Sequence, residues 1–268
     1  MACKENVNSI DENIDLWPRL VAQAQAVLER EPALSVALQN FVLDHGSFVD
    51  ALAARIARKL SYTDKEFVDV SGLCKEAFAG DPFISIQCQN DIAATVECDP
   101  ACDSELIPFL WFKGFLAIAT YRIAHYFWLR ERRFVALFLQ SRVSEILSVD
   151  IHPAAKIGCG IFLDHATGFV AGETAVIDNN VSILHAVTLG GNGKEIGDRH
   201  PKVRSGVLIG AGAKILGNIV IGECAKIGAG SVVLEDVPAH TTVAGVPAKI
   251  VGVSSEADPA LAMNHKIS

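Results

Sequence analysis

The sequence predicts an α+β protein in which an N-terminal all-helical domain is followed by a parallel β-helix. Glycine is unevenly distributed, because residues 1–150 contain 4 of the 21 glycines and residues 151–268 contain the other 17. From Ile151 to about Val251, apolar residues recur every six positions. This period fits neither an α-helix nor a simple strand. A six-residue repeat is instead the signature of a parallel β-helix.

The repeat consists of two series separated by an interruption. Three hexads would form one triangular coil of 18 residues, and successive coils would stack at about 4.8 Å. A β-sandwich would show alternating strands and turn signals every 8–12 residues instead. The first series contains Ile151, Ile157, Leu163, Phe169, Ala175, Val181 and Val187, and the second contains Ile209, Ile215, Ile221, Ile227 and Val233.

The N-terminal part shows helical periodicity and helix boundary signals. Pro32 suits the first turn of a helix. Thr63 and Glu66 have the spacing of a capping box, and Pro82 follows the end of that helix. The helices are expected at residues 13–30, 33–44, 47–60, 63–80, 83–97, 106–130 and 133–148.

These patterns divide the chain into three regions. We expect a helical domain at 1–148 and a β-helix domain at 149–252. Within the latter, a loop at about 190–204 is rich in glycine and charge and would be extruded from the coil, where function is often located. Residues 253–268 are small, polar and non-periodic, so we expect a flexible tail.

Charge and cysteine content restrict the class of protein. Residues 1–150 carry 14 Lys and Arg against 21 Asp and Glu, and residues 151–268 carry 9 against 10, which argues against a nucleic-acid partner. The most apolar window, 106–129, contains three basic residues and predicts a buried helix rather than a membrane span. Seven cysteines without a CxxC pair and a polar N-terminus indicate a cytoplasmic protein with reduced cysteines.

Two acidic residues and a histidine occupy positions that a structural coil would not require. Asp164 and His165 follow Leu163, and Asp150 precedes Ile151. A coil of 18 residues would place position 168 above position 150, so that Asp150 and His165 lie about one layer apart. A carboxylate–imidazole contact there would create a general base. The alternative is a surface histidine that merely lies near a surface aspartate.

The extruded loop offers a second group. Arg199 could hold a substrate carboxylate through two hydrogen bonds, with His200 beside it, although a solvated loop charge fits the sequence equally well. Asp99 and Asp103 flank a proline and could be turn residues only. No GxSxG, Rossmann or P-loop motif is present, which favours direct transfer with a base over a covalent intermediate.

Several segments resemble the serine O-acetyltransferases, a family of hexapeptide acyltransferases. The resemblance covers about residues 15–252. The segments are Asp150-Ile-His-Pro-Ala-Ala-Lys-Ile-Gly, Leu163-Asp-His-Ala-Thr-Gly, Gly172-Glu-Thr-Ala-Val-Ile, Val187-Thr-Leu-Gly-Gly, Gly197-Asp-Arg-His-Pro-Lys, Ile209-Gly-Ala-Gly-Ala-Lys-Ile-Leu-Gly-Asn, Ala244-Gly-Val-Pro-Ala-Lys and, in the helical part, Leu110-Trp-Phe-Lys-Gly-Phe followed by Tyr121-Arg-Ile.

The resemblance implies a left-handed β-helix and a role for each site residue. His165 matches the catalytic base and Asp150 its paired carboxylate. Asp99 and Asp164 match carboxylates that bind the serine amino group, and Arg199 with His200 matches the residues that hold the serine carboxylate. Acetyl-CoA would be a co-substrate rather than a permanently bound cofactor. The candidate contacts for acetyl-CoA are backbone groups at Gly191, Ala211 and Ala229.

The resemblance also implies partners. The substrates would be L-serine and acetyl-CoA, in the first step of L-cysteine biosynthesis, and L-cysteine would inhibit by occupying the serine site. The assembly would be a homotrimer, with two trimers joined through the helical domains. In many members a C-terminal isoleucine enters the O-acetylserine sulfhydrylase. Here Ile267 is followed by Ser268, which shifts the terminal carboxylate by one residue.

Two other functions fit a β-helix. A zinc hydratase would need three histidine ligands, including a His-x4-His pair, but His165, His185 and His200 do not provide that spacing. We therefore expect no metal site. A non-enzymatic scaffold would leave the group formed by Asp150, His165 and Arg199 without a role.

Overall fold

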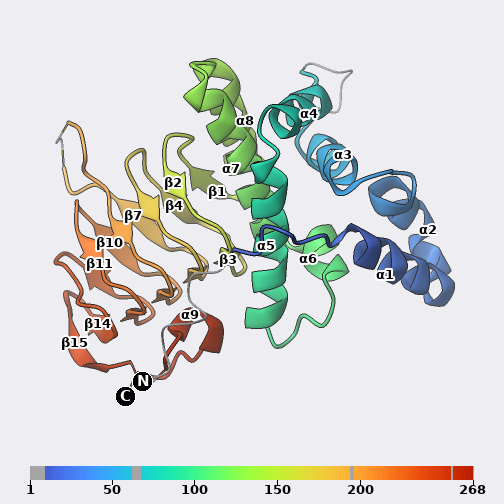
Figure 1. Cartoon of the computed structure of the whole chain (residues 1–268). Coiled ribbons are helices and arrows are strands. Elements are labelled where there is room, and N and C mark those ends of the chain that lie inside the picture. Colours follow the sequence, from blue (N-terminus) through green and yellow to red (C-terminus); the bar gives the residue numbers. More distant parts are fainter. Residues whose placement is uncertain (1–9, 62–67, 194–195, 255, 268) are drawn as a thin grey trace.

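The computed structural model describes residues 10–61, 68–193, 196–254 and 256–267. It confirms the predicted fold class, because a helical region is followed by a parallel β-solenoid (Figure 1). The long helix α5 stands between the solenoid and helices α1 to α4, whereas α7 and α8 contact the solenoid directly (Figure 1). None of the described helices is long and apolar enough to span a bilayer. The cysteines within the described residues are free and buried.

The helices follow the apolar periodicity, with three differences. The helix expected at 33–44 is divided into short 3-10, α and π segments, and the helix expected at 106–130 is broken at Phe112. The helix expected from residue 63 is described from Val70, where the Asp69 side chain caps it; Thr63 and Glu66 lie outside the described residues. The elements are α1 (Trp17–Arg30), η1 (Pro32–Leu34), α2 (Ser35–Leu38), η2 (Gln39–Leu43), α3 (Phe48–Leu60), α4 (Val70–Gly80), α5 (Phe83–Cys98), α6 (Leu106–Trp111), α7 (Lys113–Leu129) and α8 (Arg133–Leu147).

The solenoid has three faces, each formed by parallel strands from successive coils. Face 1 contains β1 (Val149–Ile151), β4 (Phe169–Ala171), β7 (Thr188–Gly190), β10 (Lys214–Leu216) and β13 (Val232–Val233). Face 2 contains β2 (Lys156–Ile157), β5 (Val176–Ile177), β8 (Lys202–Val203) and β11 (Val220–Ile221). Face 3 contains β3 (Phe162–Leu163), β6 (Ser182–Ile183), β9 (Leu208–Ile209), β12 (Lys226–Ile227), β14 (Thr241–Gly245) and the antiparallel β15 (Ala248–Val253).

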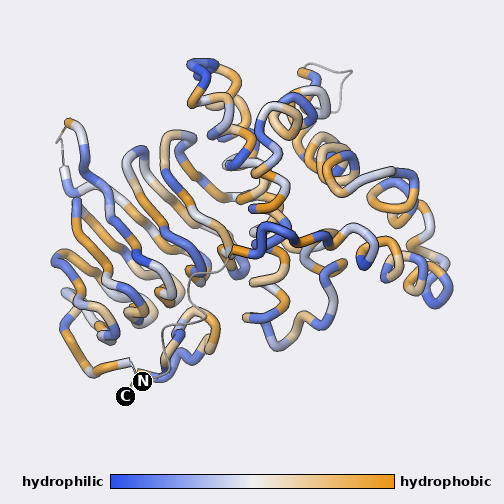
Figure 2. The backbone as a smooth tube through the Cα atoms, viewed as in Figure 1, coloured by the Kyte–Doolittle hydropathy of each residue, from blue (hydrophilic) through white to orange (hydrophobic). Residues whose placement is uncertain are grey.

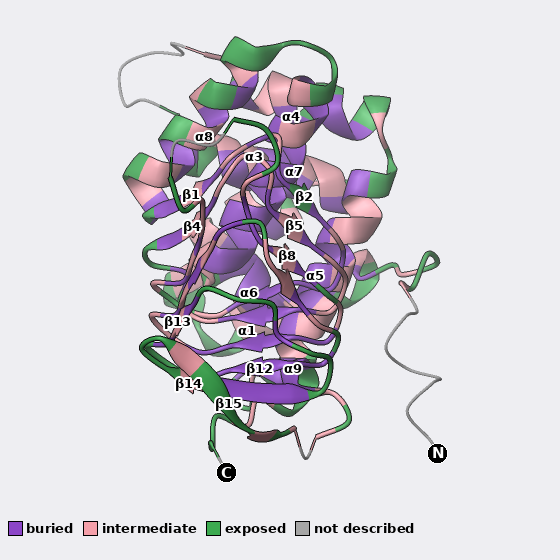
Figure 3. Cartoon of the chain, turned by 90° about the vertical axis from the view of Figure 1, so that its left-hand side faces the viewer, coloured by how far each residue is buried: buried purple, intermediate pink, exposed green. Residues whose placement is uncertain are grey.

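The solenoid is filled by the apolar side chains of these short strands. Apolar residues recur along each coil (Figure 2). The strand residues that point inward are buried, whereas much of the outermost strand β15 is exposed (Figure 3). The core therefore runs along the solenoid axis and continues into the helical part.

The pairing register corrects the expected 18-residue coil. Ile151 pairs with Ala171 and Leu163 with Ile183, so the first coil contains 20 residues rather than 18. Ala171 pairs with Leu189 at the regular spacing of 18, whereas Ile183 pairs with Ile209, 26 residues later, because the extruded loop intervenes. The first coil thus contains a two-residue insertion, which lies between β3 and β4.

The first hexad series is therefore wrong by two positions beyond Leu163. Ile177 and Ile183, rather than Ala175 and Val181, continue the register of Leu163. Each hexad contains two buried apolar residues that are two positions apart. A count in steps of six therefore still meets an apolar residue after the insertion, although it is the wrong one of the two. Asp150 consequently pairs with Val170, and the predicted stacking of position 168 above position 150 is wrong.

The expectation of a flexible tail is also wrong for part of residues 253–268. Pro259–Ala262 form α9, which begins with the Asp258 side chain accepting a hydrogen bond from the Leu261 amide at 3.0 Å. The Ser182 hydroxyl donates to the Ala260 carbonyl at 2.9 Å, and Ala260 is buried beside α5. An Asp-Pro pair is a helix start signal, but the polar composition concealed it, and contact with the solenoid stabilises the segment.

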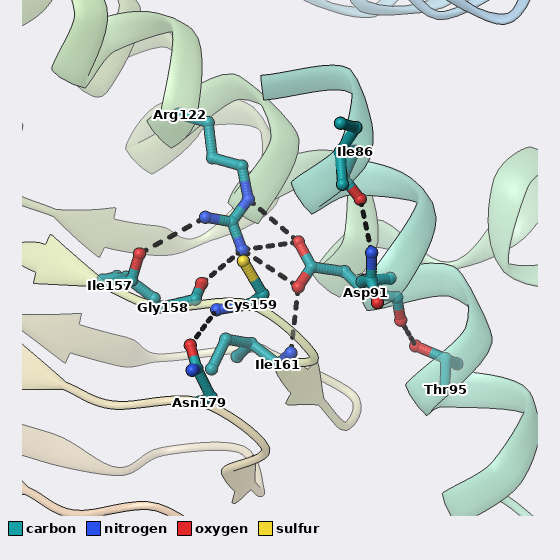
Figure 4. A network of polar contacts seen from close by, with 10 residues as sticks. Ile86, Asp91, Thr95, Arg122, Ile157, Gly158, Cys159, Ile161 and Asn179 are labelled. Atoms are coloured by element: carbon teal, nitrogen blue, oxygen red, sulfur yellow. Dashed lines mark hydrogen bonds and ion pairs between the residues drawn. The ribbon is translucent and has the colours of Figure 1, made fainter. Parts of the chain in front are cut away.

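A buried ion pair joins the helical part to the solenoid (Figure 4). The Arg122 guanidinium of α7 donates to both carboxylate oxygens of Asp91 on α5, at 2.7–2.9 Å, and both side chains are about 2% exposed or less. Burial is the strongest single influence and lowers the pKa of Arg122, but the charge and hydrogen bonds of Asp91 together with the nearby Cys88 and Cys159 outweigh it, so that the pKa of Arg122 is raised. Arg122 also donates to the Gly158 carbonyl at 2.7 Å, and the Ile161 amide donates to Asp91 at 2.9 Å. We call this group the clasp.

Removing one partner of the clasp should be costly. We expect Arg122→Met to lower the free energy of unfolding by about 3–5 kcal/mol, because it leaves the buried Asp91 carboxylate without its cation. The double variant Asp91→Leu/Arg122→Met should lose less than Arg122→Met alone. Urea denaturation measures these differences. Arg133→Met is the control, since the exposed Arg133–Glu131 pair should contribute about 0–1 kcal/mol. Equal losses for Arg122→Met and Arg133→Met would contradict the role of the clasp.

Candidate active site

The two-residue insertion forms a tight turn that carries Asp164 and His165. His165 and Ala166 both adopt left-handed backbone conformations, with φ of 54° and 59°. Such residues are strained and persist where their surroundings hold them. The Thr167 amide donates to the His165 carbonyl at 2.7 Å, and the Gly168 amide donates to the carbonyl of Ser148, which caps α8 directly before β1. The turn thus projects the His165 side chain from the coil, and that side chain is 74% exposed.

His165 lies at the corner between faces 3 and 1, which we call the His165 corner (residues 164–168, 184–187, 210–213 and 228–231). The ring of His185 packs edge-on against that of His165, with 5.8 Å between centroids. The Gly212 amide donates to the His185 carbonyl, and the Gly230 amide donates to the Ala211 carbonyl. Ala211 and Ala229, two of the predicted acetyl-CoA contacts, therefore lie in the coils stacked beyond His165.

Asp99 and Asp164 line one cavity of about 550 Å³ between the end of α5, β3 and the C-terminal segment. Burial raises the pKa of Asp164, and the nearby negative charge of Asp99 raises it further, while His165 opposes the shift. Two carboxylates that repel each other would be stabilised by a cation between them. The cavity is therefore suited to an ammonium group.

Arg199 and His200 lie elsewhere, at the corner between faces 1 and 2, which we call the Arg199 corner (residues 152–155, 172–175, 191–193 and 196–201). Arg199 donates to Glu173 at 2.8 Å, and this hydrogen bond lowers the pKa of Glu173. His200 is 7% exposed, and its Nδ1 contacts the Thr174 hydroxyl at 2.8 Å. Burial, followed by the charge of Arg199, lowers the pKa of His200. Gly191 lies beside the Arg199 side chain.

Asp150 lies on face 1, between the two corners. Its carboxylate accepts a hydrogen bond from Gln140 of α8 at 2.6 Å. Within the part of the chain that the structure describes, the carboxylate next to the His165 ring is Asp164, at 3.7 Å, and no ion pair joins Asp150 to His165. The predicted contact between Asp150 and His165 is therefore not among the ion pairs of the described residues, where Asp164 is the partner of His165.

The two groups are too far apart to bind one small molecule within a single chain. Asp99, Asp164 and His165 meet at the His165 corner, whereas Arg199 and His200 meet at the Arg199 corner. Along face 1 the corners are separated by the three residues of β4 or of β7, which corresponds to roughly 13 Å from the end of one corner to the start of the next. The structure therefore places the residues predicted to bind the amino group and those predicted to bind the carboxylate at opposite edges of one face.

Sequence reasoning missed several residues at these corners. Glu173 and Thr174 hold Arg199 and His200 in place, and the signal was present, since both belong to the Gly172-Glu-Thr segment. Met263 and His265 line the cavity with Asp99, but a segment taken for a flexible tail offered no reason to place them there.

The other chemical groups near the cavity do not suggest a nucleophile or a metal. Burial raises the pKa of the Cys98 thiol to about 12, which disfavours the reactive thiolate. Within the described ranges, no three His, Cys, Asp or Glu side chains converge in a way that could hold a metal ion. The arrangement fits a base acting on a bound hydroxyl group.

Comparison with known proteins agrees with this chemistry. Residues 16–120 match the family model "Serine acetyltransferase, N-terminal", and residues 200–235 match "Bacterial transferase hexapeptide (six repeats)". The serine acetyltransferase of Escherichia coli K12 is 51% identical over 257 residues, which cover 96% of this chain and 94% of the relative. That of Haemophilus influenzae is 50% identical over 252 residues, which cover 94% of both chains.

Solved structures give the same result. The serine acetyltransferase of Vibrio cholerae is 50% identical, with a TM-score of 0.91, and covers 94% of this chain and 97% of its own. A serine acetyltransferase in complex with cysteine has the same identity and TM-score and covers 94% of this chain and 98% of its own. The enzyme of Brucella abortus in complex with coenzyme A is 48% identical, with a TM-score of 0.87, and covers 92% of this chain and 99% of its own. The chain belongs to the serine acetyltransferase family.

Proposed function

We propose that this serine acetyltransferase transfers the acetyl group of acetyl-CoA to the hydroxyl of L-serine with His165 as the general base. The observation that carries the proposal is the exposed His165 ring at the edge of a cavity lined by Asp99 and Asp164. Relatives with serine, cysteine or coenzyme A bound support this choice of ligands.

The reaction needs one proton to be moved twice. His165 takes the proton of the serine hydroxyl while its oxygen attacks the thioester carbonyl carbon, forming the new C–O bond. When the C–S bond breaks, His165 returns the proton to the departing thiolate, which leaves as CoA, and the product is O-acetyl-L-serine. Acetyl-CoA would lie along the His165 corner, where the backbone of Ala211 and Ala229 continues the stack. Gly191 lies at the Arg199 corner, so it would contact an acetyl-CoA molecule bound at the His165 corner of a neighbouring chain.

The carboxylates would divide the remaining work. Asp99 and Asp164 hold the serine amino group in the cavity, since an ammonium relieves the repulsion between them. We propose that Asp150 orients His165. Its carboxylate would then have to give up the hydrogen bond from Gln140 and accept one from the imidazole. Asp164 already lies beside the ring, so it competes for the same role.

We propose that the complete site forms between two subunits of a homotrimer. A serine bound at Asp99 and Asp164 cannot reach the Arg199 of its own chain, because that residue lies across face 1. A neighbouring chain that presents its Arg199 corner to the His165 corner would supply the carboxylate subsite. Three such heterologous contacts close a ring. We further propose, from the family resemblance, that helical parts join two trimers.

The C-terminal segment is proposed to contact the sulfhydrylase that uses the product. In this structure the segment lies on its own solenoid, because the Lys226 ammonium donates to the Lys266 carbonyl at 2.6 Å and Ile267 packs over Gly228. Binding of Ile267 to another protein would require this contact to open.

His165→Ala tests the base. We expect kcat to fall by about 10²–10⁴-fold, which is the usual contribution of general base catalysis. Steady-state kinetics measure it, with His45→Ala in the helical part as the control. Retention of more than about a tenth of wild-type kcat would count against the role. The variants Asp150→Asn and Asp164→Asn then decide which carboxylate orients the ring. Substitution of the carboxylate that orients His165 should lower kcat at saturating serine.

Arg199→Ala should raise the serine KM while leaving the acetyl-CoA KM nearly unchanged, because Arg199 would hold only the carboxylate of serine. Co-expression with His165→Ala tests the shared site. Random mixed trimers would pair an intact His165 corner with an intact Arg199 corner at about a quarter of the sites. Mixed trimers no more active than the separate variants would place the whole site within one chain.

L-Cysteine should inhibit competitively against serine. It keeps the amino and carboxylate groups that Asp99, Asp164 and Arg199 are proposed to hold, and only the hydroxyl becomes a thiol. Initial rates at several cysteine concentrations measure this, repeated with Asp99→Ala. The variant should lose serine affinity and cysteine sensitivity together. Inhibition that high serine does not relieve, or that Asp99→Ala leaves intact while the serine KM rises, would place cysteine at a separate site.

A further inference from the structure

The break between α6 and α7 brings the helical part against the end of β3. Phe112 is extended there, with φ of −85° and ψ of 116°, so the chain changes direction before α7 begins. A Cβ on Gly114 would lie 2.0 Å from the Leu163 carbonyl oxygen, which allows only glycine at this approach. Leu163 directly precedes Asp164 and His165. The break thus fixes the entry to the turn that carries the base.

Lys113, next to that glycine, contacts the far side of the same turn. Its ammonium donates to the Thr167 hydroxyl at 2.5 Å. Thr167 is tied to His165 through its amide, at 2.7 Å, and more weakly through its hydroxyl, at 3.4 Å. The Ala186 amide of the next coil donates to the Thr167 carbonyl at 2.7 Å. Lys113 therefore links the start of α7 to the residue that closes the His165 turn.

We propose that Lys113 is a positioning residue that holds the His165 turn through Thr167. The turn needs such support, because two consecutive non-glycine residues in it are left-handed and the His165 side chain is largely exposed. The ring of an exposed histidine is placed mainly by its backbone. A displacement of the turn would therefore move the base away from the serine hydroxyl, which lowers the rate of proton transfer. This inference rests on the proposed role of His165.

The alternative role for Lys113 is direct contact with an anionic part of a substrate, and kinetics distinguish the two. Lys113→Met removes the ammonium but keeps the length, and Thr167→Val removes the hydroxyl but keeps the shape. Each should lower kcat by about tenfold, with both KM values within about twofold of wild type and the thermal midpoint unchanged. The double variant should lose no more than either single one, because both remove the same contact. Lys113→Arg should restore part of kcat. Lys75→Met is the control, since that lysine is 61% exposed on α4.

Measurement of Lys113→Met in the His165→Ala background separates the positioning role of Lys113 from the base role of His165. If Lys113 acts through His165, Lys113→Met should leave the residual rate of His165→Ala unchanged. A wild-type kcat in Lys113→Met, additive losses with Thr167→Val, a rise in one KM alone, or an equal loss in the His165→Ala background would each overturn the positioning role. A fully active His165→Ala would overturn the base assignment and this role together. An inactive His165→Ala with a fully active Lys113→Met would overturn this role alone.

Discussion

The buried ion pair of Asp91 and Arg122 is the interaction that sets the helical part on the solenoid. Two charges in a dry interface are stable only when their hydrogen-bonding capacity is filled, and here the backbone of the solenoid fills it (Figure 4). The carbonyl of Gly158 and the amide of Ile161 belong to the turn between β2 and β3. Helices α5 and α7 can therefore dock on the solenoid in one position only, since a shifted position would leave the buried charges or the buried backbone groups unpaired.

The clasp has consequences for the site because α5 continues from it to the cavity. Asp91 lies in the middle of α5, and Asp99 caps its C-terminal end, two helical turns further on. With α5 fixed against β3, Asp99 faces Asp164 across a space that the C-terminal segment closes on another side. The helical part thus forms one wall of the cavity. The proposed serine site on the coil would therefore include a residue from a separate, all-helical region.

The turn that carries His165 shows how a solenoid can hold strained backbone geometry. A regular coil uses the same turn at every corner, and its ladder of backbone hydrogen bonds continues on both sides of the two inserted residues. The rigid strands β3 and β4 hold the ends of the turn, while Lys113 and Gly114 support it from the helical side. Rigid neighbours allow the left-handed conformations of His165 and Ala166, which would be unfavourable in a free loop.

The sequence by itself determined the two-part fold, because the hexad period and the glycine distribution are local patterns that do not depend on contacts between distant residues. It also identified the residue types of the site, since Asp-His and Arg-His segments interrupt an otherwise apolar repeat. Only the tertiary structure decided the register, because a two-residue insertion cannot be detected where both candidate positions are apolar. The predicted neighbour of Asp150 was therefore two positions from its true neighbour, Val170. Only the tertiary structure placed Asp164 and Arg199 at different corners and docked α9 beside the cavity. Such contacts join residues far apart in the chain, and local pattern carries no information about them.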